Sequence, residues 1–153
     1  MKHLTDREQI IHGVFSRART LAVVGASPRG GRHSNVVCGY LRRAGFDVIP
    51  IRPDRAEVAG LPSWASLADL PPGACDVVVI FRRPDAVEPH LYEAAERRPL
   101  AVWLAPGVWT PRLDAVAAAL GLTLIKDQCI EEAHRHDARR RGHPEATPEF
   151  RAR

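Results

Sequence analysis

Five short apolar runs, separated by segments of a different character, limit the folds open to this chain more than any other feature of its sequence. Each run is rich in β-branched or other apolar residues, is too short for a helix, and lacks alternation, as in strands buried on both faces. The runs cover residues 20–24, 47–51, 76–81, 100–104 and 122–125. Strands of this kind indicate a parallel sheet, in which each neighbouring pair requires a crossover connection.

Helix start and stop signals lie between most of the runs. Three predicted helices, bounded by glycine, proline or N-cap residues, cover residues 35–44, 85–98 and 110–121. Thr5 and Glu8 have the spacing of a capping box and predict another helix before the first run. Residues 52–73 contain four prolines, so the second crossover is expected to be irregular. The pattern predicts a single Rossmann-like, doubly wound α/β domain with a mainly parallel five-stranded sheet.

Charge divides the chain into two parts. The formal net charge is +4, and residues 133–153 hold six arginines against three acidic residues, which leaves +3 in that segment. We therefore expect a folded domain over residues 1–132 and a basic, partly disordered C-terminal tail over residues 133–153. The nearly neutral domain does not predict a nucleic-acid partner, although a tail that binds nucleic acid is an alternative.

Membrane and secretion signals are not recognisable in the sequence. No stretch approaches the roughly 20 apolar residues of a membrane-spanning helix, and the N-terminus lacks the apolar core of a secretory signal. We therefore expect a cytoplasmic protein with no membrane partner. Cys38, Cys75 and Cys129 lack the spacing of a disulfide framework or a zinc site, so we expect them to be small buried hydrophobic residues.

The turn after the first run, residues 24–35, is a candidate anion site. In open α/β sheets, ligands bind beyond the carboxyl ends of the strands, near the point where strand order reverses. Glycines in this turn let backbone amides approach an anion, Ser27 and Ser34 offer hydroxyl groups, and Arg32 offers charge. The turn matches neither the G-x-G-x-x-G dinucleotide fingerprint nor a P-loop.

The residues after the second run narrow the choice of ligand. NAD-binding proteins place an acidic residue there to hold the ribose hydroxyls, whereas Arg52 follows this run. A cation suits a ribose that carries a phosphate, as in NADP or in the 3′-phospho-ADP part of coenzyme A. Asp54, which comes after Pro53, leaves a weaker argument for NAD.

Aromatic and cationic residues also end the third and fourth runs. Phe81, Arg82 and Arg83 close the third run, and Trp109 lies shortly after the fourth. Because parallel strands end at one edge of a sheet, these residues are expected to lie near Arg52. An apolar wall beside guanidinium groups suits an adenine ring and its phosphates.

Taken in order, these motifs resemble those of the small stand-alone coenzyme A-binding proteins, which are similar to the CoA-binding domains of succinyl-CoA synthetase and ADP-forming acetyl-CoA synthetase. The resemblance runs from about Arg19 to Ile130. The matching motifs are residues 23–28, Arg32 with Ser34, Pro50 with Pro53, residues 66–70, residues 81–83, residues 103–104 with 107–108, and Asp127 with Cys129. Their order and spacing, rather than any one motif, carry the resemblance.

The resemblance implies that residues 1–132 are a Rossmann-like CoA-binding domain and that coenzyme A is its ligand. The diphosphate would lie over residues 25–27, and the adenosine between Arg52 on one side and Phe81 on the other. The predicted site comprises Gly25, Ala26, Ser27, Pro28, Arg32, Ser34, Arg52, Pro53, Arg55, Phe81, Arg82, Arg83 and Gly107. Two positions depart from the family pattern, since Arg52 stands where Asn is usual and Ala105 where Gln is usual.

No catalytic or metal-binding group is predicted. We find no nucleophile with a base and no paired carboxylates, and the group Cys129, His134, His136 and His143 has no standard metal-ligand spacing. His33 is expected to be a solvated loop residue or an extra hydrogen-bond donor. The prediction is non-catalytic binding of coenzyme A or an acyl-CoA through its phosphoadenosine diphosphate moiety. A small NADP-dependent oxidoreductase is the alternative, and a homodimer is compatible with either.

Overall fold

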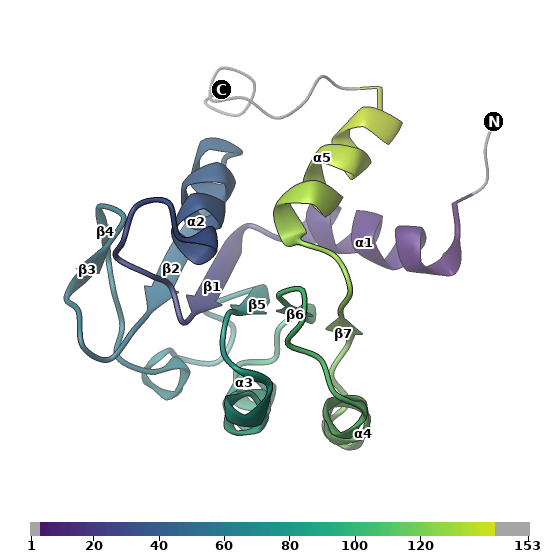
Figure 1. Cartoon of the computed structure of the whole chain (residues 1–153). Coiled ribbons are helices and arrows are strands. Elements are labelled where there is room, and N and C mark those ends of the chain that lie inside the picture. The colour runs from purple at the N-terminus through teal and green to yellow at the C-terminus, as the bar shows by residue number, and fades with distance from the viewer. Residues whose placement is uncertain (1–3, 143–153) are drawn as a thin grey trace.

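Five parallel strands form the central sheet of the computed structural model, which describes residues 4–142 (Figure 1). In spatial order they are β2 (Asp47–Ile51), β1 (Thr20–Val24), β5 (Val77–Ile80), β6 (Ala101–Leu104) and β7 (Leu124–Ile125). The chain passes from β1 outward to β2 and then returns to β5 on the other side of β1, so strand order reverses at β1. This topology confirms the predicted Rossmann-like, doubly wound sheet.

Helices cover both faces of the sheet (Figure 1). The helices α1 (Asp6–Arg17), α2 (His33–Arg43) and α5 (Ile130–Arg140) pack on one face, and α3 (Glu88–Arg97) and α4 (Pro111–Leu120) on the other. Successive strand residues enter opposite cores: Val79 and Trp103 belong to the first, Ile80 and Leu104 to the second. Both faces are covered, so the strands are apolar without alternation.

An irregular crossover joins β2 to β5, as predicted. It contains a short antiparallel pair, β3 (Glu57–Val58) and β4 (Leu61–Pro62), followed by the 3₁₀ helix η1 (Leu67–Asp69). A second 3₁₀ helix, η2 (Pro84–Ala86), precedes α3. The α-helix predicted to begin at residue 85 therefore begins at Glu88, after this turn. Proline favours such short turns because its φ is fixed and it lacks an amide proton.

Most predicted helix boundaries are found, and the exceptions have local causes. The capping box is present: the Glu8 amide donates to Thr5 Oγ1 at 3.1 Å, and the Thr5 amide to Glu8 Oε2 at 2.9 Å. Gly121 ends α4 with a φ of +72°. The last strand begins at Leu124 rather than at Leu122, because the Leu122 amide still bonds to the Ala117 carbonyl at 2.9 Å.

The C-terminal end of the described chain differs from the expected tail. From residue 133 a partly disordered extension was expected, but residues up to Arg140 form α5, which packs on the sheet and on α1. His134 and Asp137 are fully buried in it. The tail interpretation was therefore wrong for residues 133–142, and residues 143–153 lie outside the described part of the chain.

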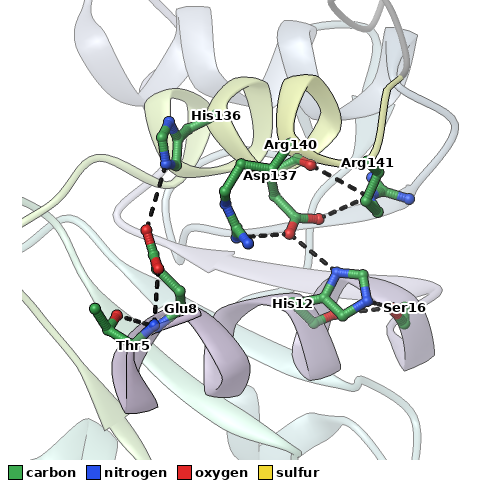
Figure 2. A network of polar contacts seen from close by, with 8 residues as sticks. All are labelled: Thr5, Glu8, His12, Ser16, His136, Asp137, Arg140 and Arg141. Atoms are coloured by element: carbon green, nitrogen blue, oxygen red, sulfur yellow. Dashed lines mark hydrogen bonds and ion pairs between the residues drawn. The ribbon is translucent and has the colours of Figure 1, made fainter. Parts of the chain in front are cut away.

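Charged partners explain why so polar a helix is buried. Figure 2 shows the Asp137 carboxylate between His12 of α1 and Arg140 and Arg141 at the end of α5, each at 3.0 Å. The Tyr40 hydroxyl meets His134 Nδ1 at 2.7 Å. Two of the arginines that suggested a solvated tail thus compensate a buried carboxylate. Among the described residues, no helix is long and apolar enough to cross a bilayer.

Candidate functional site

The carboxyl ends of β1, β2, β5 and β6 meet at one edge of the sheet, where a cavity of about 750 Å³ opens. It lies where strand order reverses, the usual ligand position in doubly wound sheets. Six arginines and one carboxylate, that of Asp54, line it, and we call it the cationic cavity. Ten predicted site residues line it: Gly25, Ser27, Pro28, Arg32, Ser34, Arg52, Arg55, Phe81, Arg82 and Arg83.

Gly25 begins the loop after β1, between the ends of the two neighbouring strands. Its amide donates to the Ile51 carbonyl of β2 at 3.1 Å, and its φ is +79°. A Cβ atom at this position would overlap the carbonyl oxygen of Phe81, which follows β5. The positive φ and the close approach both require glycine here.

Two serines shape the loop between β1 and α2. The Ser34 hydroxyl accepts from the Ser27 amide at 2.9 Å, and the Ser27 hydroxyl accepts from the Arg29 amide at 3.2 Å. The Asn35 side-chain amide donates to the Ser27 carbonyl at 2.8 Å. A hydroxyl that accepts in this way keeps its own proton, so both serines can still donate to a ligand.

The N-terminus of α2 adds to the positive character of the cavity. Arg32 at the N-cap makes no side-chain cap hydrogen bond, and the first turn contains no acidic residue. Arg32, His33 and Ser34 all line the cationic cavity. The unpaired amides and the dipole of a helix N-terminus favour an anion at such a place.

Arg52 joins the end of β2 to the loop after β1. Its Nε donates to Asp54 Oδ1 at 2.7 Å, and its Nη1 to the Ala26 carbonyl at 3.3 Å. The hydrogen bond from Arg52 lowers the pKa of Asp54 and keeps it ionised. Arg32 and Arg52 come from separate elements and line the same cavity. The carboxylate of Asp54, which would argue for NAD, is paired with Arg52.

A second cavity, of about 450 Å³, continues from the first between β2, β5 and α3, and we call it the adjoining cavity. Arg52 and Phe81 line both. Gly25, Asp54 and Arg82 also line both cavities. The remaining lining residues of the adjoining cavity are the apolar Val24, Ile51, Pro53 and Ala65, together with Ser66 and His90. The edge of the sheet therefore offers a cationic compartment next to a narrower, more apolar one.

Three predicted residues lie beside the cationic cavity rather than in its wall. Ala26 is buried and contributes its carbonyl to Arg52, and Pro53 lines the adjoining cavity. Gly107 forms a turn with a φ of +81° between two lining residues. The predicted site omitted eleven other lining residues of the two cavities: Val24, Arg29, His33, Ile51, Asp54, Ala65, Ser66, His90, Ala105, Pro106 and Val108. Arg29, Asp54, Ala105, Pro106 and Val108 lie in the loops after β1, β2 and β6, so their position in the sequence could have indicated them.

His33 is exposed, as expected, and it is the first residue of α2 rather than part of the loop. Its Nε2 lies 3.2 Å from Cys129 Sγ, and its ring meets the Phe81 ring edge-on with centroids 5.5 Å apart. All three cysteines are free and buried, which confirms the prediction for them. Burial raises the pKa of Cys129 and favours its thiol form. Within residues 4–142, no three His, Cys, Asp or Glu side chains gather as a metal site would require.

A doubly wound parallel sheet with an arginine-lined cavity at its reversal point defines this protein as a Rossmann-like domain whose cavity lies at the usual ligand position of such folds. More particularly, the chain belongs to the CoA binding domain family, which matches residues 19–135. The match extends into α5, in agreement with the packing of that helix.

Relatives and solved structures agree with this membership. The uncharacterized protein YneT of Bacillus subtilis is 31% identical over 124 residues, which is 81% of this chain and 91% of that protein. A structure from Thermus thermophilus is 33% identical, with a TM-score of 0.77 over 85% of this chain and 98% of the other. A hypothetical protein from Pyrococcus horikoshii is 26% identical, with a TM-score of 0.80 over 89% and 98%.

Proposed function

We propose that this protein binds coenzyme A or an acyl-CoA without transforming it. The observation that carries the proposal is that Arg32 of the β1–α2 loop and Arg52 after β2 line one cavity with four further arginines. Coenzyme A carries a diphosphate and a 3′-phosphate, and guanidinium groups with open helix amides are suited to all three phosphates. Membership of the CoA binding domain family supports the same ligand.

The two cavities suit different parts of this ligand. In the proposal the diphosphate lies over the Gly25–Ser27 turn and the N-terminus of α2, and the 3′-phosphate lies near Arg52 and Arg55. The adenine enters the adjoining cavity, between Pro53 and Phe81. The pantetheine arm then extends out of the protein through the open side of the cationic cavity.

A carrier or sensor role fits the side chains better than catalysis. His33 contacts a cysteine whose raised pKa favours the unreactive thiol, and Asp54 is paired with Arg52. Neither pair is a nucleophile with an oriented base facing the cavity. The alternative, binding of NADP, rests on the same Arg52 and Arg55, because the 2′-phosphate of NADP would need the same cations.

Calorimetric titration with CoA, dephospho-CoA, NADP and NAD at one salt concentration tests the proposal. We expect CoA to bind tightest and dephospho-CoA about 10-fold more weakly, because it lacks the phosphate that pairs with arginine. Arg55→Gln should remove most of that difference. Arg17→Gln, at an exposed position on α1 outside both cavities, is the matched control and should leave it unchanged.

Two results would reject the proposal. NADP binding tighter than CoA would favour the oxidoreductase, and no heat of binding with CoA at millimolar concentration would remove CoA as the ligand. Deletion of residues 143–153 tests the nucleic-acid alternative, which predicts salt-sensitive binding to nucleic acid that the deletion abolishes.

A further inference from the structure

A polar network of Ser66, His90 and Glu93 adjoins the cavity between β2, β5 and α3. Glu93 of α3 is its centre: one carboxylate oxygen lies 2.7 Å from His90 Nδ1, and the other accepts from the Ser66 hydroxyl at 2.9 Å. Ser66 Oγ in turn accepts from the Ala68 amide at 3.1 Å, at the start of η1. His90 and Ser66 line the cavity, whereas Glu93 stands behind them.

This network fixes the orientation and the tautomer of His90. The side chains of His90 and Glu93 are only 19% and 27% exposed, so solvent competes little for their contact. A carboxylate oxygen accepts hydrogen bonds, so Nδ1 carries the proton. In the neutral ring Nε2 is then unprotonated, so the ring nitrogen of His90 that Glu93 does not contact is a hydrogen-bond acceptor.

The rest of the cavity suits a flat heterocycle. Ile51, Pro53 and Ala65 supply apolar walls, and Phe81 contributes an aromatic ring. The cations Arg52 and Arg82 lie where this cavity meets the cationic one, on the side where phosphates would enter. Asp54, which is paired with Arg52, also lines this cavity, so His90 is the acceptor on the side of α3. Apolar walls with a few oriented polar groups are the arrangement by which binding sites recognise the edge of a base.

We propose that His90 selects the base of the bound nucleotide, accepting a hydrogen bond from the exocyclic amino group of adenine and disfavouring an oxo group at the same position. Glu93 is the positioning residue that holds the imidazole in the accepting tautomer, and Ser66 fixes Glu93. The inference rests on the proposed binding of coenzyme A, since it assigns that ligand's base to this cavity. An oxo group facing Nε2 would set two acceptors against each other.

The test compares CoA with deamino-CoA, in which hypoxanthine replaces adenine and an oxo group replaces the amino group. Titration calorimetry should give about 10-fold tighter binding of CoA by the unaltered protein, the worth of one well-made hydrogen bond against an acceptor clash. His90→Phe keeps an aromatic ring of similar size and should reduce this ratio to about 2-fold or less. Glu93→Gln should lower the ratio, while Glu96→Gln, an exposed carboxylate on the same helix, should not.

The readout is the ratio of two affinities, so a general loss of stability does not imitate it. Equal binding of both ligands by the unaltered protein, or an unchanged ratio in His90→Phe, would overturn the role of His90 and leave CoA binding intact. Failure of the unaltered protein to bind CoA would instead reject the proposed function. Thermal unfolding of each variant shows whether it folds. If His90→Phe does not fold, the ratio measured with Glu93→Gln takes its place.

Discussion

Gly25 lies where the ends of three strands meet, and its backbone sets the shape of the cationic cavity. Its amide is bonded to Ile51 of β2, and the Phe81 carbonyl occupies the space that a side chain would need. Gly31, later in the same loop, also has a positive φ, of +87°, but nothing within 4 Å of where its Cβ would be. Alanine substitutions at these two glycines therefore distinguish the cost of backbone strain at positive φ from the cost of steric overlap.

Gly25→Ala is expected to lower the free energy of unfolding by about 2–4 kcal/mol, because strain at positive φ adds to overlap with a backbone oxygen that cannot move aside. Gly31→Ala should cost only the strain, about 1 kcal/mol. Urea unfolding followed by circular dichroism measures both. Equal losses in the two variants would mean that contact with Phe81 does not decide the conformation at Gly25.

Site residues that follow a strand could be predicted from the sequence, and those that reach the site from elsewhere could not. Arg52 and Phe81 lie next to apolar runs, and the topology of a parallel sheet brings such positions together. His90 lies inside a helix and Ser66 in an irregular crossover. Ser66 belonged to a recognised motif, but its link to Glu93 depends on the packing of η1 against α3, which no local pattern specifies.

Helix α5 shows how an element can be misread when its buried face is polar. Its buried positions, Ile130, Ala133, His134, Asp137 and Ala138, have helical spacing. Two of the five are titratable, and the arginines around them resemble a solvated segment. Besides Arg140 and Arg141, the buried groups of α5 have His12 of α1 and Tyr40 of α2 as partners. The sequence of the helix alone shows neither His12 nor Tyr40.

Asp137→Asn tests how much this network holds α5 to the domain (Figure 2). The substitution leaves Arg140 and Arg141 without their carboxylate and should lower the free energy of unfolding by about 2–4 kcal/mol. Asp85→Asn, the same change in the exposed pair with Arg83, should cost less than about 0.5 kcal/mol. Urea unfolding at neutral pH compares them. A small effect at Asp137 would show that contacts other than this carboxylate anchor α5.

The central sheet is shared by two hydrophobic cores, one on each face. The core under α1, α2 and α5 includes Cys38, and the core under α3 and α4 includes Cys75. Neighbouring residues of each strand face opposite cores, so neither core can open without disturbing strands that the other requires. This sharing explains why the overall fold could be predicted from the sequence, because continuous apolar runs occur where both faces of a strand are covered.

Two of the three buried thiols, those of Cys38 and Cys75, report whether both faces of the sheet unfold together. Burial raises the pKa of Cys38 to about 12 and is the main cause that raises that of Cys75 to about 11, so near pH 8 almost no thiolate is present in the folded protein. We expect iodoacetamide to label both thiols very slowly without urea, and at the same midpoint urea concentration in short labelling pulses. Mass spectrometry of the digested protein distinguishes the two cysteines. Labelling of Cys75 at clearly lower urea than Cys38 would mean that α3 and α4 separate first, and that the shared sheet does not make residues 4–142 one cooperative unit.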